Sequence, residues 1–174
     1  MNTGTAKSSN LAAAFLGELQ HEAATTRKVL ERISEDKFDF KPHEKSLTMG
    51  VLATHVAEMF NWIKITLETD ALDFAAGDYV PAKPQTTAEL VEVLDRHVAE
   101  AVESLNNAAD ETFMADWSLK NGAQTYFTMP KIQVLRSFCF NHIIHHRGQL
   151  SLYLRMNDIP VPALYGPSAD EGQM

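Results

Sequence analysis

Histidines are the residues of this 174-residue sequence whose spacing could support chemistry. His142 and His146 are four residues apart, and two imidazoles at i and i+4 on a helix can bind one metal ion. Counting 100° per residue from Leu135 places both at the centre of the apolar face of the last predicted helix, whereas Arg147 points away from that face. His55 lies on the apolar stripe of an earlier predicted helix, and the two faces meet in a bundle. The sequence therefore predicts a metal site of His55, His142 and His146.

The alternative is that these histidines are ordinary core residues with hydrogen-bond partners. Few polar side chains share their stripe, and an unsatisfied buried polar group costs about 1–3 kcal/mol. A metal ion would satisfy all three imidazoles and keep an open coordination position, as catalytic zinc does. Nickel, iron or cobalt also accept three nitrogen ligands. Ile143 stands where a metalloprotease helix carries its glutamate, so we do not expect peptide hydrolysis.

Other candidate residues receive plainer interpretations. Gln149, one turn after His146, is placed to orient an imidazole or a metal-bound water. His97 faces inward from a third helix and is interpreted as a packed core histidine, with a fourth ligand or a residue behind the ligands as the alternatives. Cys139, one turn before His142, is interpreted as a small buried hydrophobe, with a thiolate metal ligand as the alternative. His21 is predicted to face solvent, and His43 is predicted to lie in a charged loop.

Four amphipathic segments must position these residues. Apolar side chains recur at spacings of three and four over residues 10–33, 48–68, 86–105 and 130–157. Residues 69–86 are predicted to form a long loop, and residues 110–129 a short hairpin or a plain loop around Asn121 and Gly122. The pattern predicts one all-α domain over residues 1–174, a four-helix bundle with a hairpin or loop insertion before the last helix.

Composition excludes several classes of function. Hydrophobic residues make up 45% of the chain, which is enough for a packed core. A net charge of −8 disfavours nucleic-acid binding, because so acidic a surface repels phosphates. No window is apolar enough for a membrane span, and the first ten residues lack the apolar stretch of a secretory signal. The single cysteine cannot form an internal disulfide, so we expect a cytoplasmic protein.

Several motifs together resemble those of the DinB family. The chain contains HIIHHRGQL at residues 142–150, YLR at 153–155, IPVP at 159–162 and YGPSADE at 165–171. Upstream it contains FKP at residues 40–42 and LATH at 52–55. The resemblance implies a four-helix bundle of the DinB/YfiT-like type and a homodimer. It also implies that a divalent metal, zinc or nickel in our expectation, is bound by His55, His142 and His146.

Relatives in the wider superfamily are metal-dependent transferases and isomerases that use low-molecular-weight thiols such as bacillithiol or mycothiol. The resemblance therefore implies a metal-dependent thiol S-transferase that acts on small electrophiles and needs no protein nucleophile. A coordinating thiol is deprotonated, which makes this chemistry plausible. The alternative is a non-catalytic, metal-binding dimer of the stress response. A third interpretation is a helical interaction domain whose histidines only fill the core.

Overall fold

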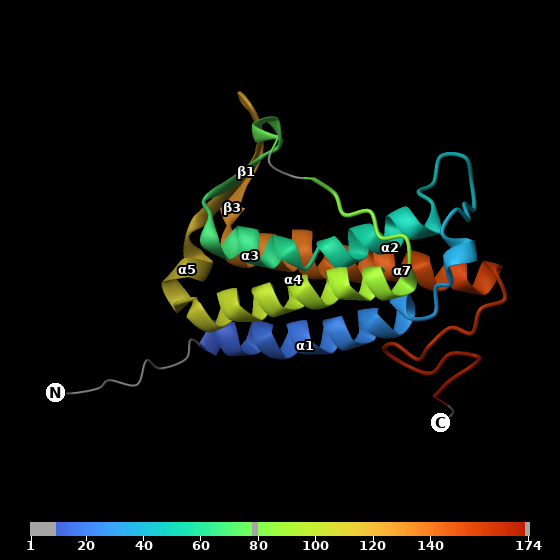
Figure 1. Ribbon diagram of the computed structural model, residues 1–174. Helices are drawn as coiled ribbons and strands as arrows, with labels where there is room; N and C mark the ends of the chain where they lie inside the picture. Colours follow the sequence, from blue (N-terminus) through green and yellow to red (C-terminus); the bar gives the residue numbers. More distant parts are fainter. Residues whose placement is uncertain (1–9, 78–79, 173–174) are drawn as a thin grey trace.

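Four long helical segments lie side by side in the computed structural model, which describes residues 10–77 and 80–172 (Figure 1). They are α1 (Asn10–Leu30), α2 with α3 (Met49–Glu58 and Asn61–Glu68), α4 (Thr87–Asn107), and α6 to α7 (Lys131–Val134 and Asn141–Met156). α1 and the last segment run in one direction, and α2, α3 and α4 run in the other (Figure 1). These are the helices that the apolar spacing predicts. Most of the polar opening stretch lies outside the described residues.

An apolar core fills the space between these helices. Leu19 of α1, Ile63 of α3, Leu94 of α4 and Leu150 of α7 are each at most 1% exposed and belong to it. Each such side chain contributes about 1.5–3 kcal/mol through burial. The helices that carry the candidate histidines are therefore held by packing along their whole length.

The second predicted helix is not continuous. α2 ends at Glu58 and α3 begins at Asn61, with Met59 and Phe60 between them. The amides of Trp62 and Ile63 donate to carbonyls only three residues back, at 3.2 Å, so the chain tightens at this point. Met59 and Phe60 are both almost fully buried. The chain thus remains buried through the break between α2 and α3.

A three-stranded sheet stands at one end of the helices, so the expectation of an all-α fold is wrong in this respect (Figure 1). β2 (Asp116–Asn121) and β3 (Gln124–Pro130) form the antiparallel hairpin that was one of two alternatives for this stretch. Its turn contains Gly122 with φ of 58°, a conformation that favours glycine. β1 (Ala71–Asp73) pairs in parallel with β2 inside the predicted long loop. Two further short elements flank the sheet, η2 (Phe74–Ala76) and α5 (Asp110–Met114).

One wide turn interrupts the last helical segment. Residues Leu135–Phe140 form a π-helix, η3, and the amide of Asn141 donates to the carbonyl of Arg136, five residues back. Such a turn holds one residue more than an α-helical turn. The helix beyond it is therefore rotated by about 100° from the position that a plain α-helical count gives.

No helix within residues 10–77 and 80–172 combines the length and the apolar character needed to cross a membrane.

Candidate metal centre

Three imidazoles meet between α2 and α7. The Nε2 atom of His55 lies 3.3 Å from that of His142, which lies 2.8 Å from the Nε2 atom of His146. One ligand nitrogen from each ring lies within 4.8 Å of the other two. All three side chains are half-buried. The structure thus brings together the three residues that the sequence analysis selected.

The outer nitrogens of two of these rings are held by hydrogen bonds. Nδ1 of His146 lies 2.7 Å from Oε1 of Gln149, and the amide nitrogen of the same glutamine lies 3.2 Å from Nε2 of His145. The Gln149 oxygen therefore accepts a hydrogen bond from the Nδ1–H group of His146, as predicted for a residue that orients an imidazole. The carbonyl of Phe138 accepts a hydrogen bond from the ring of His142.

These bonds determine where the lone pairs lie. A neutral imidazole carries one N–H, and in His142 and His146 that group points outward, away from the cluster. Their Nε2 atoms then face each other as acceptors with no proton between them. A tetrahedral zinc ion with Zn–N distances of about 2.0–2.1 Å would hold its nitrogens about 3.3 Å apart, close to the spacing of His55 and His142. The three rings could hold a divalent metal ion.

The cluster also favours neutral rings. Burial, followed by the neighbouring imidazoles His146 and His55, lowers the pKa of His142 to about 4. Burial lowers the pKa of His55, and repulsion from His146 acts in the same direction. A neutral imidazole is the form that binds a metal. At neutral pH, His55 and His142 are therefore ready to act as ligands without first losing a proton.

The histidine pair lies at the edge of the buried face of α7, and the prediction that it lies at the centre is wrong. Lys131, Leu135 and Cys139 are buried at a spacing of four, and a second buried stripe begins at Phe140, the last residue of the wide turn. The members of that stripe in α7 are Ile143, Arg147, Leu150 and Leu154. The extra residue in η3 rotates His142 and His146 out of the core and toward α2. Val51, one turn before His55, is likewise 54% exposed, so the cluster opens to the side of the helices.

Arg147 is the second correction on this helix. It was predicted to point away from the apolar face, yet it is 1% exposed and lies against α1. Its guanidinium donates to the carbonyl and carboxylate of Glu22 and to Thr26, at 2.5–3.1 Å, and also contacts the hydroxyl of Tyr165. A buried arginine needs such partners, and the helical spacing of α7 alone does not reveal them.

The other candidates lie apart from the cluster. His97 is largely buried on α4, with Nδ1 3.6 Å from Glu100, and it is not among the residues that meet His55. His21 and His43 are exposed. Cys139 is fully buried, and burial raises the pKa of its thiol to about 12, so its interpretation as a small hydrophobe is confirmed.

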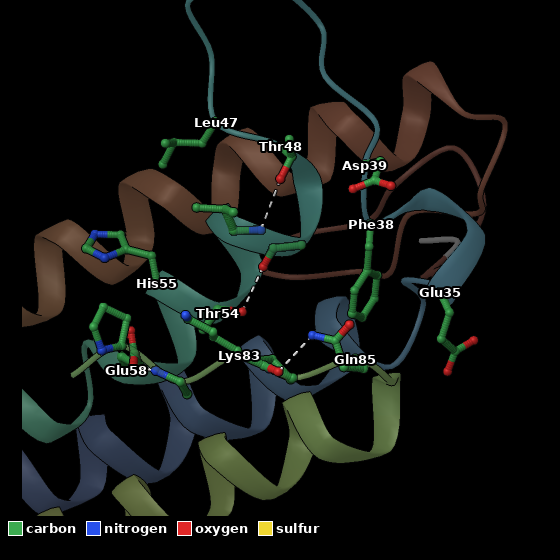
Figure 2. A pocket seen from close by; sticks show the side chains of 15 residues that line it. Glu35, Phe38, Asp39, Leu47, Thr48, Thr54, His55, Glu58, Lys83 and Gln85 are labelled. Atoms are coloured by element: carbon green, nitrogen blue, oxygen red, sulfur yellow. Dashed lines mark hydrogen bonds between the residues drawn. The ribbon is translucent and has the colours of Figure 1, made fainter.

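Two clefts adjoin His55, and His142 and His146 line neither of them. The larger has a volume of about 670 Å³, and Figure 2 shows His55 and Glu58 at one end and Glu35 and Asp39 at the other. The ring of Phe38 closes part of its wall against Gly50, where an added Cβ would lie only 3.1 Å away. The smaller cleft, of about 350 Å³, shares only His55 and Glu58 with it.

Glu58 is a site residue that the sequence analysis missed. It lies one turn after His55 on α2, is 7% exposed and accepts a hydrogen bond from the amide of Ala82 at 2.6 Å. A carboxylate in a helix that is otherwise largely apolar was the available signal, since an acidic residue is seldom buried without a partner.

The fold and the cluster define a mostly helical protein with three histidines between two of its helices that could hold a divalent metal. The sequence profile of the DinB family matches residues 1–173, and the chain belongs to this family. It is 24% identical over 160 residues to the uncharacterized protein YrdA of Bacillus subtilis (strain 168), covering 90% of this chain and 89% of that one.

Two solved structures resemble the fold. The DinB-like protein YjoA of Bacillus subtilis has a TM-score of 0.66 at 20% identity, covering 84% of this chain and 94% of its own. A DinB-like protein of Bacillus cereus ATCC 10987 has a TM-score of 0.63 at 20% identity, covering 87% and 95%. These likenesses support the fold of the whole helical assembly.

Proposed function

We propose that this chain binds one divalent transition metal through His55, His142 and His146 and acts as a metal-dependent thiol S-transferase on small electrophiles. The observation that carries the proposal is the pair of inward-facing Nε2 atoms of His142 and His146, 2.8 Å apart. Their protons are engaged outside the cluster, so a cation between them removes the repulsion of the two lone pairs. Zinc and nickel are the ions that we expect.

The chain's own residues supply orientation and access. Gln149 and the Phe138 carbonyl fix the two rings of α7, while α2 presents the third from across the gap. A metal bound there would supply acidity, lowering the pKa of a thiol that enters its open position. The thiol proton passes to water, the sulfur forms a bond to an electrophilic carbon, and the leaving group departs with its electron pair. The two clefts beside His55 give both reactants a route to this point.

Elemental analysis of protein purified without chelator tests the site. We expect about one transition metal per chain in the parent and in His43→Ala, whose ring lies in an exposed loop, and its loss in His55→Ala and His142→Ala. The metal should also raise the melting temperature of the parent. A hundredfold excess of free metal over Kd adds about 2.7 kcal/mol to the free energy of unfolding. Absence of metal from the parent after reconstitution with zinc and nickel would contradict the proposal.

Turnover tests the reaction. The metal-loaded parent, given cysteine and chloroacetamide, should consume both faster than free metal does, and His142→Ala should not. If the protein binds metal but consumes no electrophile with any thiol tested, the transferase is contradicted and the non-catalytic metal-binding protein replaces it. The homodimer stays a prediction, which light scattering of the purified protein checks.

A further inference from the structure

The smaller cleft differs in chemistry from the larger one. Beyond His55 and Glu58 it is lined by Asn61 and by five apolar side chains, which are Met59, Trp62, Ile65, Leu72 and Phe74. The larger cleft carries three carboxylates, those of Glu35, Asp39 and Glu58, together with the ammonium group of Lys83. The two spaces therefore meet at one imidazole of the candidate centre and favour different kinds of ligand.

An exposed aromatic ring forms the outer wall of the smaller cleft. Phe74 is 46% exposed, and its ring centroid lies 6.5 Å from that of Trp62. The turn that carries it is fixed, because the carboxylate of Asp73 accepts hydrogen bonds from the amides of Ala75 at 2.9 Å and Gly122 at 2.8 Å. A phenyl ring held partly in water by its backbone offers apolar surface to a ligand at little ordering cost.

Size and charge restrict the occupant. A volume of about 350 Å³ lies at the small end of the range for ligand pockets, so the cleft accepts a ring-sized group. No lysine or arginine lines it, and the carboxylate of Glu58 lies at the end near His55. Anionic groups are therefore disfavoured, and a neutral, apolar group is the one that this lining binds.

We infer that the smaller cleft binds the neutral aromatic or hydrocarbon group of the electrophile, with its reactive carbon toward His55. This inference rests on the proposed function and names its substrate class. The hydrophilic thiol approaches from the larger cleft. Its proton passes to water, the new sulfur–carbon bond forms at the carbon attached to the apolar group, and the bond from that carbon to the leaving group breaks with the electron pair going to the leaving group.

Binding to the metal-free protein tests the cleft independently of the metal. The probe is 4-nitrobenzyl alcohol, a neutral aromatic quencher of tryptophan fluorescence. Trp62 lines the cleft, whereas Trp117 is fully buried in the small core behind it and does not line it. We expect saturable quenching that is lost in Trp62→Phe and weakened roughly fivefold to tenfold in Phe74→Ala. Tyr126→Ala, which removes a similarly exposed ring from the hairpin, should match the parent. Quenching that is unsaturable, or equal in Phe74→Ala and the parent, would overturn the inference.

Selectivity in turnover separates failure of the cleft from failure of the proposed function. With cysteine as the thiol, the metal-loaded parent should favour 4-nitrobenzyl chloride over chloroacetamide by about tenfold in kcat/KM, each relative to its uncatalysed rate. Phe74→Ala should reduce this ratio. Equal acceleration of both electrophiles overturns the inference and leaves the transferase standing. If neither is consumed, the transferase fails, and the quenching experiment alone decides whether the cleft binds apolar rings.

Discussion

Two neighbouring residues of α7 show two ways in which a helix accommodates polar side chains. Arg147 turns toward α1, where Glu22, Thr26 and Tyr165 satisfy its guanidinium within the protein. His146 turns toward His55 of α2, and its inner nitrogen meets that of His142 on its own helix and no proton donor. The first arrangement is complete as it stands, and the second could be completed by a cation. The same helix therefore carries a structural network on one side and the candidate metal centre on the other.

The largest expected effect comes from breaking the structural side. Arg147→Met removes the cation and leaves the Glu22 carboxylate buried without it, which should lower the free energy of unfolding by about 3–5 kcal/mol. Urea unfolding of the metal-free protein measures this. Arg136→Met is the matched control, since Arg136 also joins the last helical segment to α1, through Glu18, but with its side chain 48% exposed. Arg136→Met should lower the free energy of unfolding by no more than about 1 kcal/mol. Equal losses in the two variants would contradict the comparison of the buried arginine with the exposed one.

A smaller effect is expected from the residue that orients His146. Gln149→Met removes the acceptor of the Nδ1 proton, so the ring can rotate or change tautomer. Affinity for zinc should fall roughly tenfold, the lower part of the range for residues behind metal ligands, because Gln149 is exposed. Competition with a chromogenic chelator measures the change. Unchanged affinity, with unchanged stability of the metal-free protein, would show that the Gln149 contact does not orient the ligand.

The smallest effect is the pH dependence of the metal-free protein. The pKa of His142 is lowered to about 4 in the folded state against about 6.5 when unfolded, so the unfolded chain binds more protons between these values. Stability should therefore be greatest above pH 6.5 and fall as the pH drops toward 4. Water screens the half-buried ring, so we expect a loss on the order of 1 kcal/mol, a few degrees in Tm. His142→Asn should flatten this dependence, and a parent that gains stability on acidification would contradict it.

Much of the architecture could be predicted because it rests on local pattern. The apolar spacing gives the long helices, and Gly122 gives the hairpin turn. β1 could not be predicted, since three residues carry little alternation and their partner, β2, lies far along the chain. The burial of Arg147 depends on Glu22, which is equally remote in sequence. Both are consequences of tertiary pairing.

The histidines could be selected from their spacing and from the family motifs, but how far their side chains are buried could not be predicted. A count of 100° per residue from Leu135 assumes a regular helix, and η3 breaks that assumption. The hydrogen bond from the amide of Asn141 to the carbonyl of Arg136, five residues back, marks the added residue. Phe74 was missed as a site residue because its position beside Trp62 depends on the unpredicted strand β1.

The wide turn also makes the candidate centre sensitive to chain length. Deleting one residue between Leu135 and Phe140 would restore a regular helix and swing His142 and His146 by about 100° relative to the hairpin and α6, with every ligand still present in the sequence. An insertion or deletion there acts on the site as a substitution of both histidines would. The number of residues in this turn thus determines the geometry of the histidine cluster as much as the identity of its residues does.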